Sequence, residues 1–406
     1  MTDCDCLIQD YLAQLPNESG LRQKPILPFN IMSSNVSKGL DGIVAASTRL
    51  SDVQGDAGVL IYSGYNINEL AGKISYEECV YLLYHGHLPN RSQLDELKKR
   101  LVEERELPKG VIDFLQNAPK NAGPMDVIRT GVSMLGLYDT GEHDTDNLDI
   151  NRRRAMSIVA KIPIITAYFH RARQGKPLLP PSKTLGEAAN FLYLINGTEP
   201  NQEMVDTIDL CYVLHADHGM NASTFSARVT IATLTDIYSA VTSAIGTLKG
   251  PLHGGANEGV IKMLQEIGSP DKVDAWVEDA LAQKKKIMGI GHRVYKTLDP
   301  RAPHLRDMAI KLSSKIGDTK WIQMSDRIAK IMKETKNLNA NVDFYSATVY
   351  YSLGLPTDLF TPIFAIARTS GWTAHILEQL ADNRLIRPQS QYVGPQDLKL
   401  VPIDKR

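Results

Sequence analysis

The apolar residues of this chain recur over long stretches with the period of an α-helix, and this pattern constrains the fold more than any other feature. Leu94, Leu97 and Leu101 follow one another at helical spacing. Ser92 with Asp95 resembles a capping box at the start of this segment. The pattern predicts a mostly α-helical protein.

The same signals recur further along the chain. Thr184 with Glu187 repeats the capping-box spacing, and Gly197 is placed to end that helix. Two further helical faces are predicted by Val273, Val277 and Ala280, and by Leu305, Met308, Leu312 and Ile316.

One short region favours β-strands. Residues 59–62 are β-branched, aliphatic or aromatic and lie between Gly58 and Gly64. We expect a small hairpin there, in an otherwise all-α fold.

Composition excludes several classes of function. The 406 residues carry 45 basic and 46 acidic side chains, so no global field favours nucleic acid or an anionic membrane. No uncharged apolar run approaches the roughly 20 residues that span a bilayer. Asp3 and Asp5 stand where a signal peptide needs basic residues, which predicts a cytoplasmic protein.

The four cysteines give no metal or disulfide pattern. Cys4, Cys6, Cys79 and Cys211 match neither a disulfide framework nor the paired spacing of structural zinc. We therefore expect no metal.

Four histidines lie in segments rich in glycine, asparagine and small residues. His215 and His218 have a spacing that could ligate a metal, but no third ligand follows, and we interpret His215 as a polar core residue or a cap. In residues 250–257 two glycines follow His253, which suits either a ligand or a tight helix crossing. His292 is the fourth, in residues 288–295.

A cationic run precedes His292. Residues 284–286 are all lysine and lead into the flexible turn 289–293, whose N–H groups could cradle a polyphosphate. The alternative is a solvated helix end. The third glycine of a dinucleotide fingerprint is missing.

Three arginines and one aspartate complete the candidate chemistry. Arg301, Arg368 and Arg387 suit carboxylates, and Arg368 follows an apolar stretch in which a cation needs an anionic partner. Asp343 opens an apolar segment, so burial could make it a base, although a buried helix cap is the common alternative.

Taken in order, these segments resemble the citrate synthase family. The resemblance covers nearly everything from about residue 40 onwards and includes PMDVIRTGVS at 124–133. Its motifs are LHADHGMNAST (214–224), GPLHGGANE (250–258), MGIGHRVYKTLDPRA (288–302), NVDFYS (341–346), AIARTSGW (365–372) and IRPQSQYVG (386–394). Ser63 departs from it, because many relatives carry arginine in a similar segment.

The resemblance implies condensation of acetyl-CoA with oxaloacetate, followed by hydrolysis of citryl-CoA, without metal or cofactor. It implies that Asp343 is the base, that His253 hydrogen-bonds the thioester oxygen, and that His292 polarises the ketone. The residues implied to hold the carboxylates are His218, Arg301, Arg368 and Arg387. Those implied to bind CoA are Lys286, Ile287, Met288, Gly289 and Ile290.

The resemblance also implies a large helical domain (residues 1–252 and 351–406) and a small one (253–350) that close over a cleft. It implies a homodimer at least, in which Arg387 reaches the partner's site. A 2-methylcitrate synthase acting on propionyl-CoA is the nearest alternative, although residues 215–219 favour acetyl-CoA. A binding protein that has lost its chemistry is the alternative from another class.

Overall fold

The computed structural model describes residues 36–141, 145 and 147–406. Cys4 and Cys6 lie outside the described residues. The chain divides into two compact units: a terminal unit, formed by the segments up to Ala46 and from Gln389, and a main unit, Ser47–Pro388. In the terminal unit the structure describes two short 3-10 helices, η1 (Lys38–Leu40) and η4 (Ile403–Lys405).

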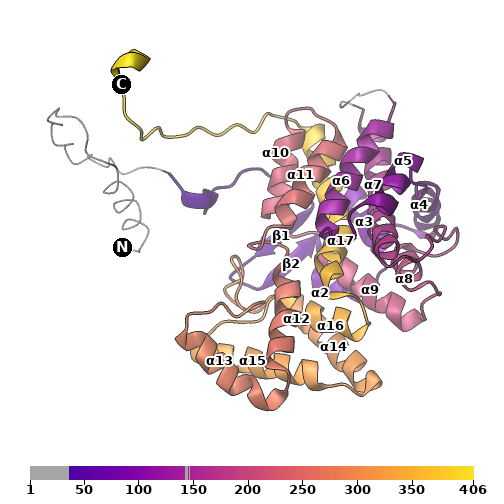
Figure 1. Ribbon diagram of the computed structural model, residues 1–406. Helices are drawn as coiled ribbons and strands as arrows, with labels where there is room; N and C mark the ends of the chain where they lie inside the picture. Colours follow the sequence, from indigo (N-terminus) through magenta and orange to yellow (C-terminus); the bar gives the residue numbers. More distant parts are fainter. Residues whose placement is uncertain (1–35, 142–144, 146) are drawn as a thin grey trace. The chain divides into compact units, whose positions relative to one another are not determined.

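The main unit is built almost entirely of helices, as the sequence predicts (Figure 1). They are α2 (Ile67–Leu70), α3 (Tyr76–His85), α4 (Arg91–Glu103), α5 (Lys109–Asn117), α6 (Pro124–Tyr138), α7 (Leu148–Arg173), α8 (Glu187–Asn196), α9 (Gln202–His215), α10 (Ala222–Ile231), α11 (Ile237–Leu248), α12 (Ala256–Ile267), α13 (Val273–Ala282), α14 (Ala302–Ile316), α15 (Lys320–Lys336), α16 (Val342–Ser352) and α17 (Phe360–Ala381), with η2 (Pro270–Lys272) and η3 (Thr357–Leu359).

Two long helices, α7 and α17, form the centre of the core. They pack against each other, and α17 also contacts α3, α6, α9, α10 and α11. Both are buried around nearly their whole circumference, with Phe169 and Trp372 among the fully buried side chains. A helix that is buried on all sides needs apolar residues on all sides, which explains the apolar content of these two segments.

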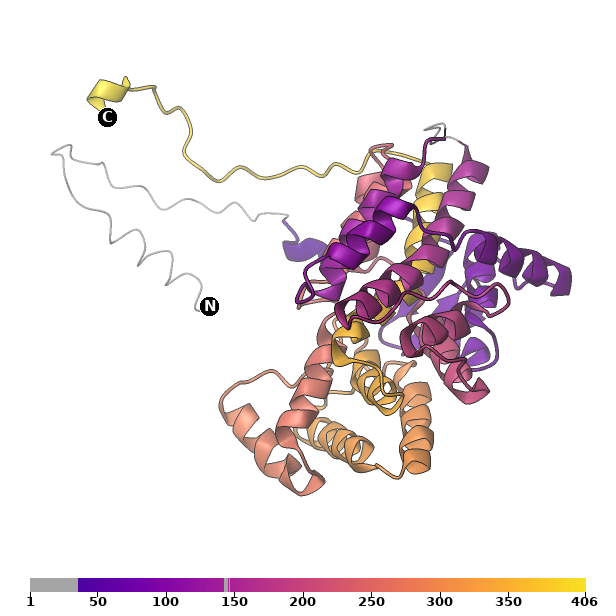
Figure 2. The same cartoon turned by 45° about the vertical axis from the view of Figure 1, so that its right-hand side comes forward.

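Helices α12–α16 form a second group, which lies together in both views of the main unit (Figures 1 and 2). Within it α16 packs on α12 and α14, and α13 packs on α15. The predicted face of α13 is buried. The predicted face of α14 is buried at Leu305 and Leu312 and partly buried at Met308, but Ile316 is 54% exposed. Ile316 is exposed because it is the last residue of the helix, before Gly317.

The predicted strand at 59–62 is confirmed as β2 (Val59–Tyr62), the central strand of a three-stranded antiparallel sheet. Its partners are β1 (Ser51–Gln54) and β3 (Tyr65–Asn66). The turn into β3 needs two residues with positive φ, and Ser63 (44°) and Gly64 (92°) provide them. β1 is missed by the sequence pattern because three of its four residues are polar.

Two predicted helix starts are wrong. Helix α4 is capped by Asn90 in a box with Gln93, two residues before the predicted cap, because asparagine is an equally good cap. Helix α8 begins at Glu187 after Gly186, so Thr184 and Glu187 form no capping box. The Glu187 carboxylate is instead in a buried ion pair with Arg105, 2.7 Å from Nη2. The predicted stop is confirmed: Gly197 follows α8 with a φ of 88°.

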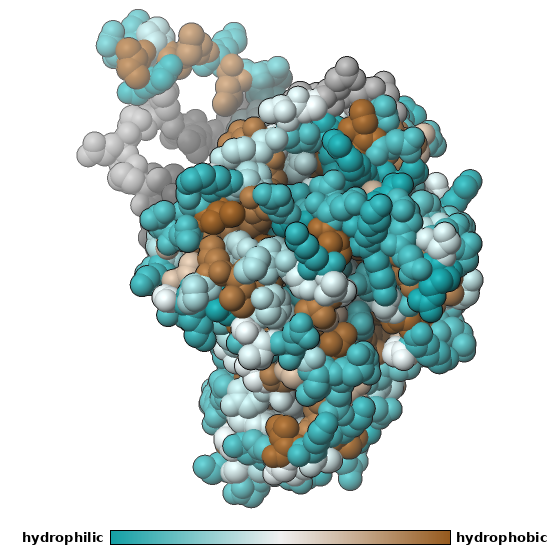
Figure 3. Space-filling view, turned by 90° about the vertical axis from the view of Figure 1, so that its right-hand side faces the viewer, coloured by the Kyte–Doolittle hydropathy of each residue, from teal (hydrophilic) through white to brown (hydrophobic). Residues whose placement is uncertain are grey.

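The face shown in Figure 3 is covered mainly by hydrophilic residues, with small hydrophobic groups among them. Such scattered apolar exposure is normal for a folded protein. In the described part of the chain, no helix combines the length and the apolar character that a membrane span requires.

Candidate active site

A short antiparallel bridge brings His292 and Asp343 into one region. Ile290 pairs with Ala340, Gly291 N–H donates to Asn339 O at 2.8 Å, and Asn341 N–H donates to Gly289 O at 2.9 Å. The Asn341 side chain spans both segments: its Nδ2 donates to Gly291 O at 2.9 Å and its Oδ1 accepts from Asp343 N at 3.0 Å.

Gly289 lets this bridge lie against α12 and α16. Its φ is 74°, and an added Cβ would lie 2.6 Å from Val260 Cγ2 and 3.0 Å from Phe344 Cα. Only glycine fits both the backbone conformation and the space. Gly289 therefore serves the packing beneath the site.

Asp343 lies in the first turn of α16 with only 8% of its surface exposed. The helix-cap alternative is wrong, because Asn341 is the N-cap. Asp343 Oδ1 accepts no hydrogen bond from any described residue. Burial raises the pKa of this carboxyl to about 7, although Arg301 and Arg368 act in the opposite direction. A carboxylate with a pKa near neutrality is suited to act as a general base.

His292 has a tautomer that its neighbours define. Its Nδ1 accepts the backbone N–H groups of Val294 and Tyr295 at 2.9 and 3.0 Å. Since a backbone N–H can only donate, the proton of the neutral ring lies on Nε2. Burial, assisted by Arg301, lowers the pKa of His292 to about 4. The ring is therefore a neutral Nε2–H donor.

In His253 the acceptor is Nε2, whereas in His292 it is Nδ1. Its Nε2 lies 2.8 Å from Ser223 Oγ and accepts Ser223 N–H at 3.4 Å. The same hydroxyl accepts the indole N–H of Trp372 at 3.0 Å. Burial lowers the pKa of His253 to about 4, so the neutral ring carries its proton on Nδ1 and can donate there.

The two glycines after His253 could make room for a ligand or allow a tight helix crossing, and their surroundings in the structure differ. A Cβ on Gly254 would lie 2.6 Å from Leu248 O, whereas one on Gly255 would meet nothing closer than 3.9 Å. Gly254 is therefore needed for close packing against the end of α11. Packing does not require glycine at position 255.

Arg301 and Arg368 bring buried positive charge to the site. Asp299 holds Arg301 bidentately at 2.9 and 2.8 Å, and Asp299 Oδ2 also accepts Val342 N–H at the start of α16. Arg368 donates through Nε to His215 O at 2.6 Å and lies over Phe364, and no described residue forms an ion pair with it. Burial lowers the pKa of Arg368 to about 10, so it stays charged at neutral pH.

His218 joins this group and His215 does not. The Nε2 of His218 lies 3.2 Å from Tyr295 Oη, and its ring centroid is 5.3 Å from that of His292. His215 is fully buried with Nδ1 2.7 Å from Cys211 O, which is the polar core role predicted for it. Among the described residues, no group of three or more His, Cys, Asp or Glu side chains is arranged to hold a metal ion.

The segment predicted to bind CoA follows α13. Lys286 is exposed, Met288 is partly buried, and Ile287, Gly289 and Ile290 are buried. Lys285 contacts other side chains of the main unit: its Nζ lies 3.0 Å from Glu266 Oε1 and 4.9 Å from the centroid of the Trp276 ring.

Arg387 is not brought to the other candidates. It is exposed in the segment after α17, and among the described residues no hydrogen bond or ion pair links it to them.

Sequence reasoning missed several polar partners of the candidates. Asp299 stands in the quoted motif Asp-Pro-Arg, where its two-residue spacing from Arg301 was the available signal. Ser223 lies within the quoted segment 214–224, but only the fold brings it to His253. Tyr295 had no signal beyond its place near His292.

The chain is similar to known proteins over most of its length. A family model described as "Citrate synthase, C-terminal domain" matches residues 39–389. Citrate synthase 2 of Bacillus subtilis is 50% identical, covering 91% of this chain and 99% of that protein. The citrate synthase of Haloferax volcanii is 48% identical over 92% of this chain and 100% of its own length.

The chain is also similar to a solved structure and to a further relative. A citrate synthase from Thermoplasma acidophilum, solved in a ternary complex with carboxymethyl coenzyme A and oxaloacetate, superimposes with a TM-score of 0.87 at 34% identity, covering 91% of this chain and 99% of that chain. A 2-methylcitrate synthase 2 from Corynebacterium glutamicum is 41% identical over 92% of this chain and 99% of its own length.

Proposed function

The chain belongs to the citrate synthase family, and we propose that the site described above carries out its condensation with Asp343 as the base. The family's reaction joins acetyl-CoA to oxaloacetate and hydrolyses citryl-CoA to citrate and CoA, in the tricarboxylic acid cycle. It is an acyl transfer, so the protein is a transferase. The observation that carries the proposal is Asp343, a buried carboxylate whose Oδ1 accepts no hydrogen bond from any described residue and which lies close enough to Arg301 and Arg368 for their charges to act on it.

The first step is removal of a proton from the methyl group of acetyl-CoA. Asp343 accepts this proton, while the Nδ1–H of His253 donates to the thioester oxygen on which charge develops. A thioester methyl is a weak carbon acid, so the base alone is not sufficient. His253 supplies the donor that stabilises the enol.

The second step forms the carbon–carbon bond. The Nε2–H of His292 donates to the ketone oxygen of oxaloacetate and makes its carbon more electrophilic. The enol carbon attacks that ketone, and the product is citryl-CoA. Water then cleaves the thioester and releases CoA and citrate.

Buried positive charge holds the substrate. Arg301 and Arg368 each have a planar guanidinium suited to a carboxylate, and His218 adds a neutral hydrogen-bonding group. Asp299 already occupies one edge of Arg301, which orients its remaining N–H groups.

The enol must meet its ketone before water protonates it, so the site must close. We assign this closure to movement of residues 253–350, the group that contains α12–α16, against the rest of the main unit. The backbone of residues 286–290 would then enclose the CoA nucleotide.

The test is release of free thiol from acetyl-CoA in the presence of oxaloacetate, compared with propionyl-CoA under the same conditions. We expect a higher specificity constant for acetyl-CoA. A higher constant for propionyl-CoA would assign the chain to the 2-methylcitrate branch. No thiol release from either substrate would favour a binding protein.

Arg387 is proposed to act in the site of a second copy of the chain. It is exposed just after the last helix of the main unit, where a chain end can reach a partner, and in a two-fold dimer the exchange is mutual. Arg387→Ala and Asp343→Ala chains should each be nearly inactive. Their isolated heterodimer has one site with both residues intact, so we expect about half the parental activity. A heterodimer as inactive as its parents would place Arg387 within its own chain's site.

A further inference from the structure

Residues 216–219, here called the 216–219 turn, connect α9 to α10 and carry His218. Gly219 has a φ of 56°, and a Cβ there would lie 3.3 Å from Val53 Cγ2. The turn is therefore packed closely against β1. Its conformation sets the direction of the His218 ring.

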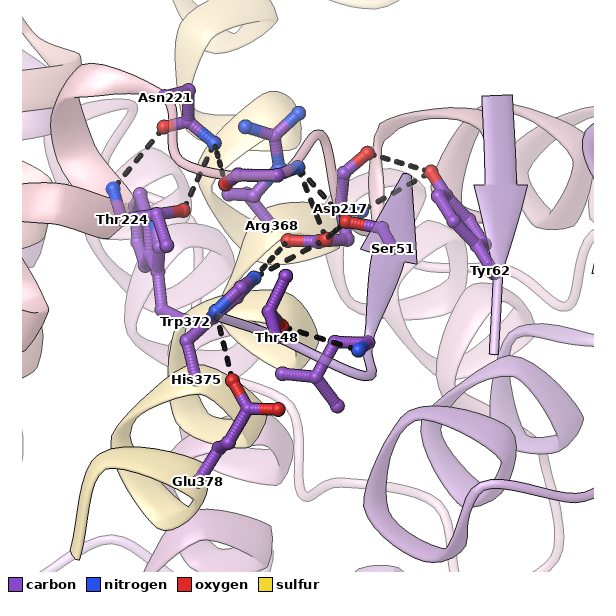
Figure 4. Close-up of polar contacts among 12 residues, drawn as sticks. Thr48, Ser51, Tyr62, Asp217, Asn221, Thr224, Arg368, Trp372, His375 and Glu378 are labelled. Atoms are coloured by element: carbon purple, nitrogen blue, oxygen red, sulfur yellow. Dashed lines mark hydrogen bonds and ion pairs between the residues drawn. The ribbon is translucent and has the colours of Figure 1, made fainter. Parts of the chain in front are cut away.

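The side chain of Asp217 is completely buried and stabilises this turn through hydrogen bonds. Its Oδ2 accepts from Ser51 Oγ and, at 3.2 Å, from Gly219 N–H, while Ser51 Oγ itself accepts Gly219 N–H at 3.0 Å. The backbone of Asp217 is held by Tyr62, whose hydroxyl donates to Asp217 O at 2.7 Å and accepts Asp217 N–H at 3.2 Å. Figure 4 shows these contacts from strand to turn.

On the opposite side the turn rests on α17. A Cβ on Gly371 would lie 2.3 Å from Ala216 O and 2.6 Å from Asp217 Oδ1, so only glycine permits this approach. One helical turn further, His375 Nε2 lies 3.3 Å from Asp217 Oδ2 and 3.2 Å from Oδ1. The helix that supplies Arg368 therefore also holds the turn that supplies His218.

The second ring nitrogen of His375 also has partners on α10 and α17. Arg228 Nη1, which can only donate, lies 3.2 Å from His375 Nδ1 and 2.7 Å from Glu378 Oε2. Because a guanidinium can only donate, Nδ1 accepts from Arg228, and the N–H of Nε2 is directed at Asp217. Burial would raise the pKa of Asp217, but His375, Arg368 and Ser51 more than offset this and lower it.

We propose that Asp217 and His375 are positioning residues, which act through the 216–219 turn to aim His218 at oxaloacetate. This inference rests on the proposed function, because it takes His218 to be an oxaloacetate ligand. Neither Asp217 nor His375 touches substrate. A buried carboxylate that receives several hydrogen bonds is a rigid support, and small displacements of a substrate-binding group are costly to catalysis.

The test compares three variants with the parent enzyme. His375→Leu removes the donor to Asp217, His375→Gln keeps an N–H at a similar position, and Ser51→Ala removes the hydroxyl on the other side. We expect His375→Leu and Ser51→Ala to lower kcat/KM for oxaloacetate by up to about 10²-fold, with KM for acetyl-CoA within about threefold of the parent. His375→Gln should recover most of the loss.

Thr373→Val is the matched control. Thr373 is buried on the same helix and its Oγ1 lies 2.6 Å from Tyr84 Oη, away from the turn. Like His375→Leu, Thr373→Val replaces a buried polar side chain of α17 by an apolar one, so it controls for a general disturbance of this helix. We expect KM for oxaloacetate to be unchanged in this variant.

A double-mutant cycle with His218→Ala decides between positioning and general structural support. If His375 acts through His218, the effect of His375→Leu on KM for oxaloacetate should largely disappear in the His218→Ala background. An undiminished effect would overturn the proposal. If His375→Leu does not fold, the cycle with Ser51→Ala, which alters a partly exposed strand residue, gives the same decision.

These measurements distinguish a failure of the proposed function from a failure of the positioning role. A parent enzyme without thiol release, or a His218→Ala variant with unchanged KM for oxaloacetate, would refute the assigned role of the site. A His218→Ala effect without any His375 or Ser51 effect would refute only the positioning role.

Discussion

Asp343→Asn should abolish most of the activity and at the same time stabilise the fold above neutral pH. The amide keeps the shape of the carboxylate, so substrate affinity should change by only a few-fold. Loss of a general base typically costs 10²–10⁴-fold in turnover. The gain in stability has a separate cause, which is removal of a buried charge.

The size of that gain follows from the pKa of Asp343, which burial raises from 3.8 to about 7. One pH unit corresponds to about 1.4 kcal/mol, so keeping this carboxylate ionised in the fold costs on the order of 4 kcal/mol as an upper bound. Below about pH 4 the carboxyl is protonated in both folded and unfolded chains, and the cost is absent. It grows as pH rises from about 4 to 7, where only the unfolded chain has lost the proton, and is constant above.

Urea unfolding of the substrate-free protein at pH 5, 6, 7 and 8, at one chain concentration, measures this dependence. We expect Asp343→Asn to become progressively more stable than the parent between pH 5 and 7. The control is Asp95→Asn, the same substitution at an exposed position on α4. A stability difference for Asp343→Asn that is constant from pH 5 to 8 would refute the reasoning.

Three further predictions concern the groups around the base. His292→Ala should leave the carbonyl stretching band of bound oxaloacetate at a higher frequency than in the parent, as measured by infrared difference spectroscopy; an unchanged frequency would exclude His292 as the polarising donor. Gly289→Ala should destabilise the protein in urea unfolding by more than Gly317→Ala, because both have a φ near 70° but only Gly289 is enclosed by other atoms; equal losses would contradict the packing argument. The kcat/KM for acetyl-CoA at saturating oxaloacetate should fall as pH drops through the pKa of Asp343, and Asp343→Asn should remove this limb; a pH profile that is flat below pH 8 would argue against a base of raised pKa.

Periodicity predicted the helical class because the core helices repeat local apolar patterns that are visible along the chain. Periodicity did not predict helix starts correctly where two nearby residues could both act as the N-cap. Asn90 and Ser92 are both good caps, and only the packing of Leu94, Leu97 and Leu101 decides where α4 begins. The strand β1 was invisible for a different reason, since its polar residues are held by pairing with β2 and by contacts to Asp217.

Some residues of the site could be predicted from the sequence and others could not. The candidates with distinctive chemistry in glycine-rich or apolar segments, such as His253 and Asp343, could be selected from sequence. Their supports could not, because serine and asparagine are common in any loop. Ser223 meets His253 across 30 residues, and His375 meets Asp217 across 158. Such pairs are created by tertiary packing, and no local spacing predicts them.

The electrostatics of the site explain why oxaloacetate should precede acetyl-CoA. In the substrate-free protein, Arg301 and Arg368 lower the pKa of Asp343 and so weaken it as a base. A dicarboxylate bound to these guanidinium groups neutralises their effect, because it places negative charge beside the same carboxyl. The pKa of Asp343 then rises further, and its conjugate base becomes a stronger proton acceptor when the ketone that will trap the enol is already in place. The acid limb of kcat/KM for acetyl-CoA, measured with oxaloacetate bound, should accordingly lie at higher pH than the transition seen in the unfolding of the substrate-free protein; a limb at lower pH would mean that the arginines do not control the base.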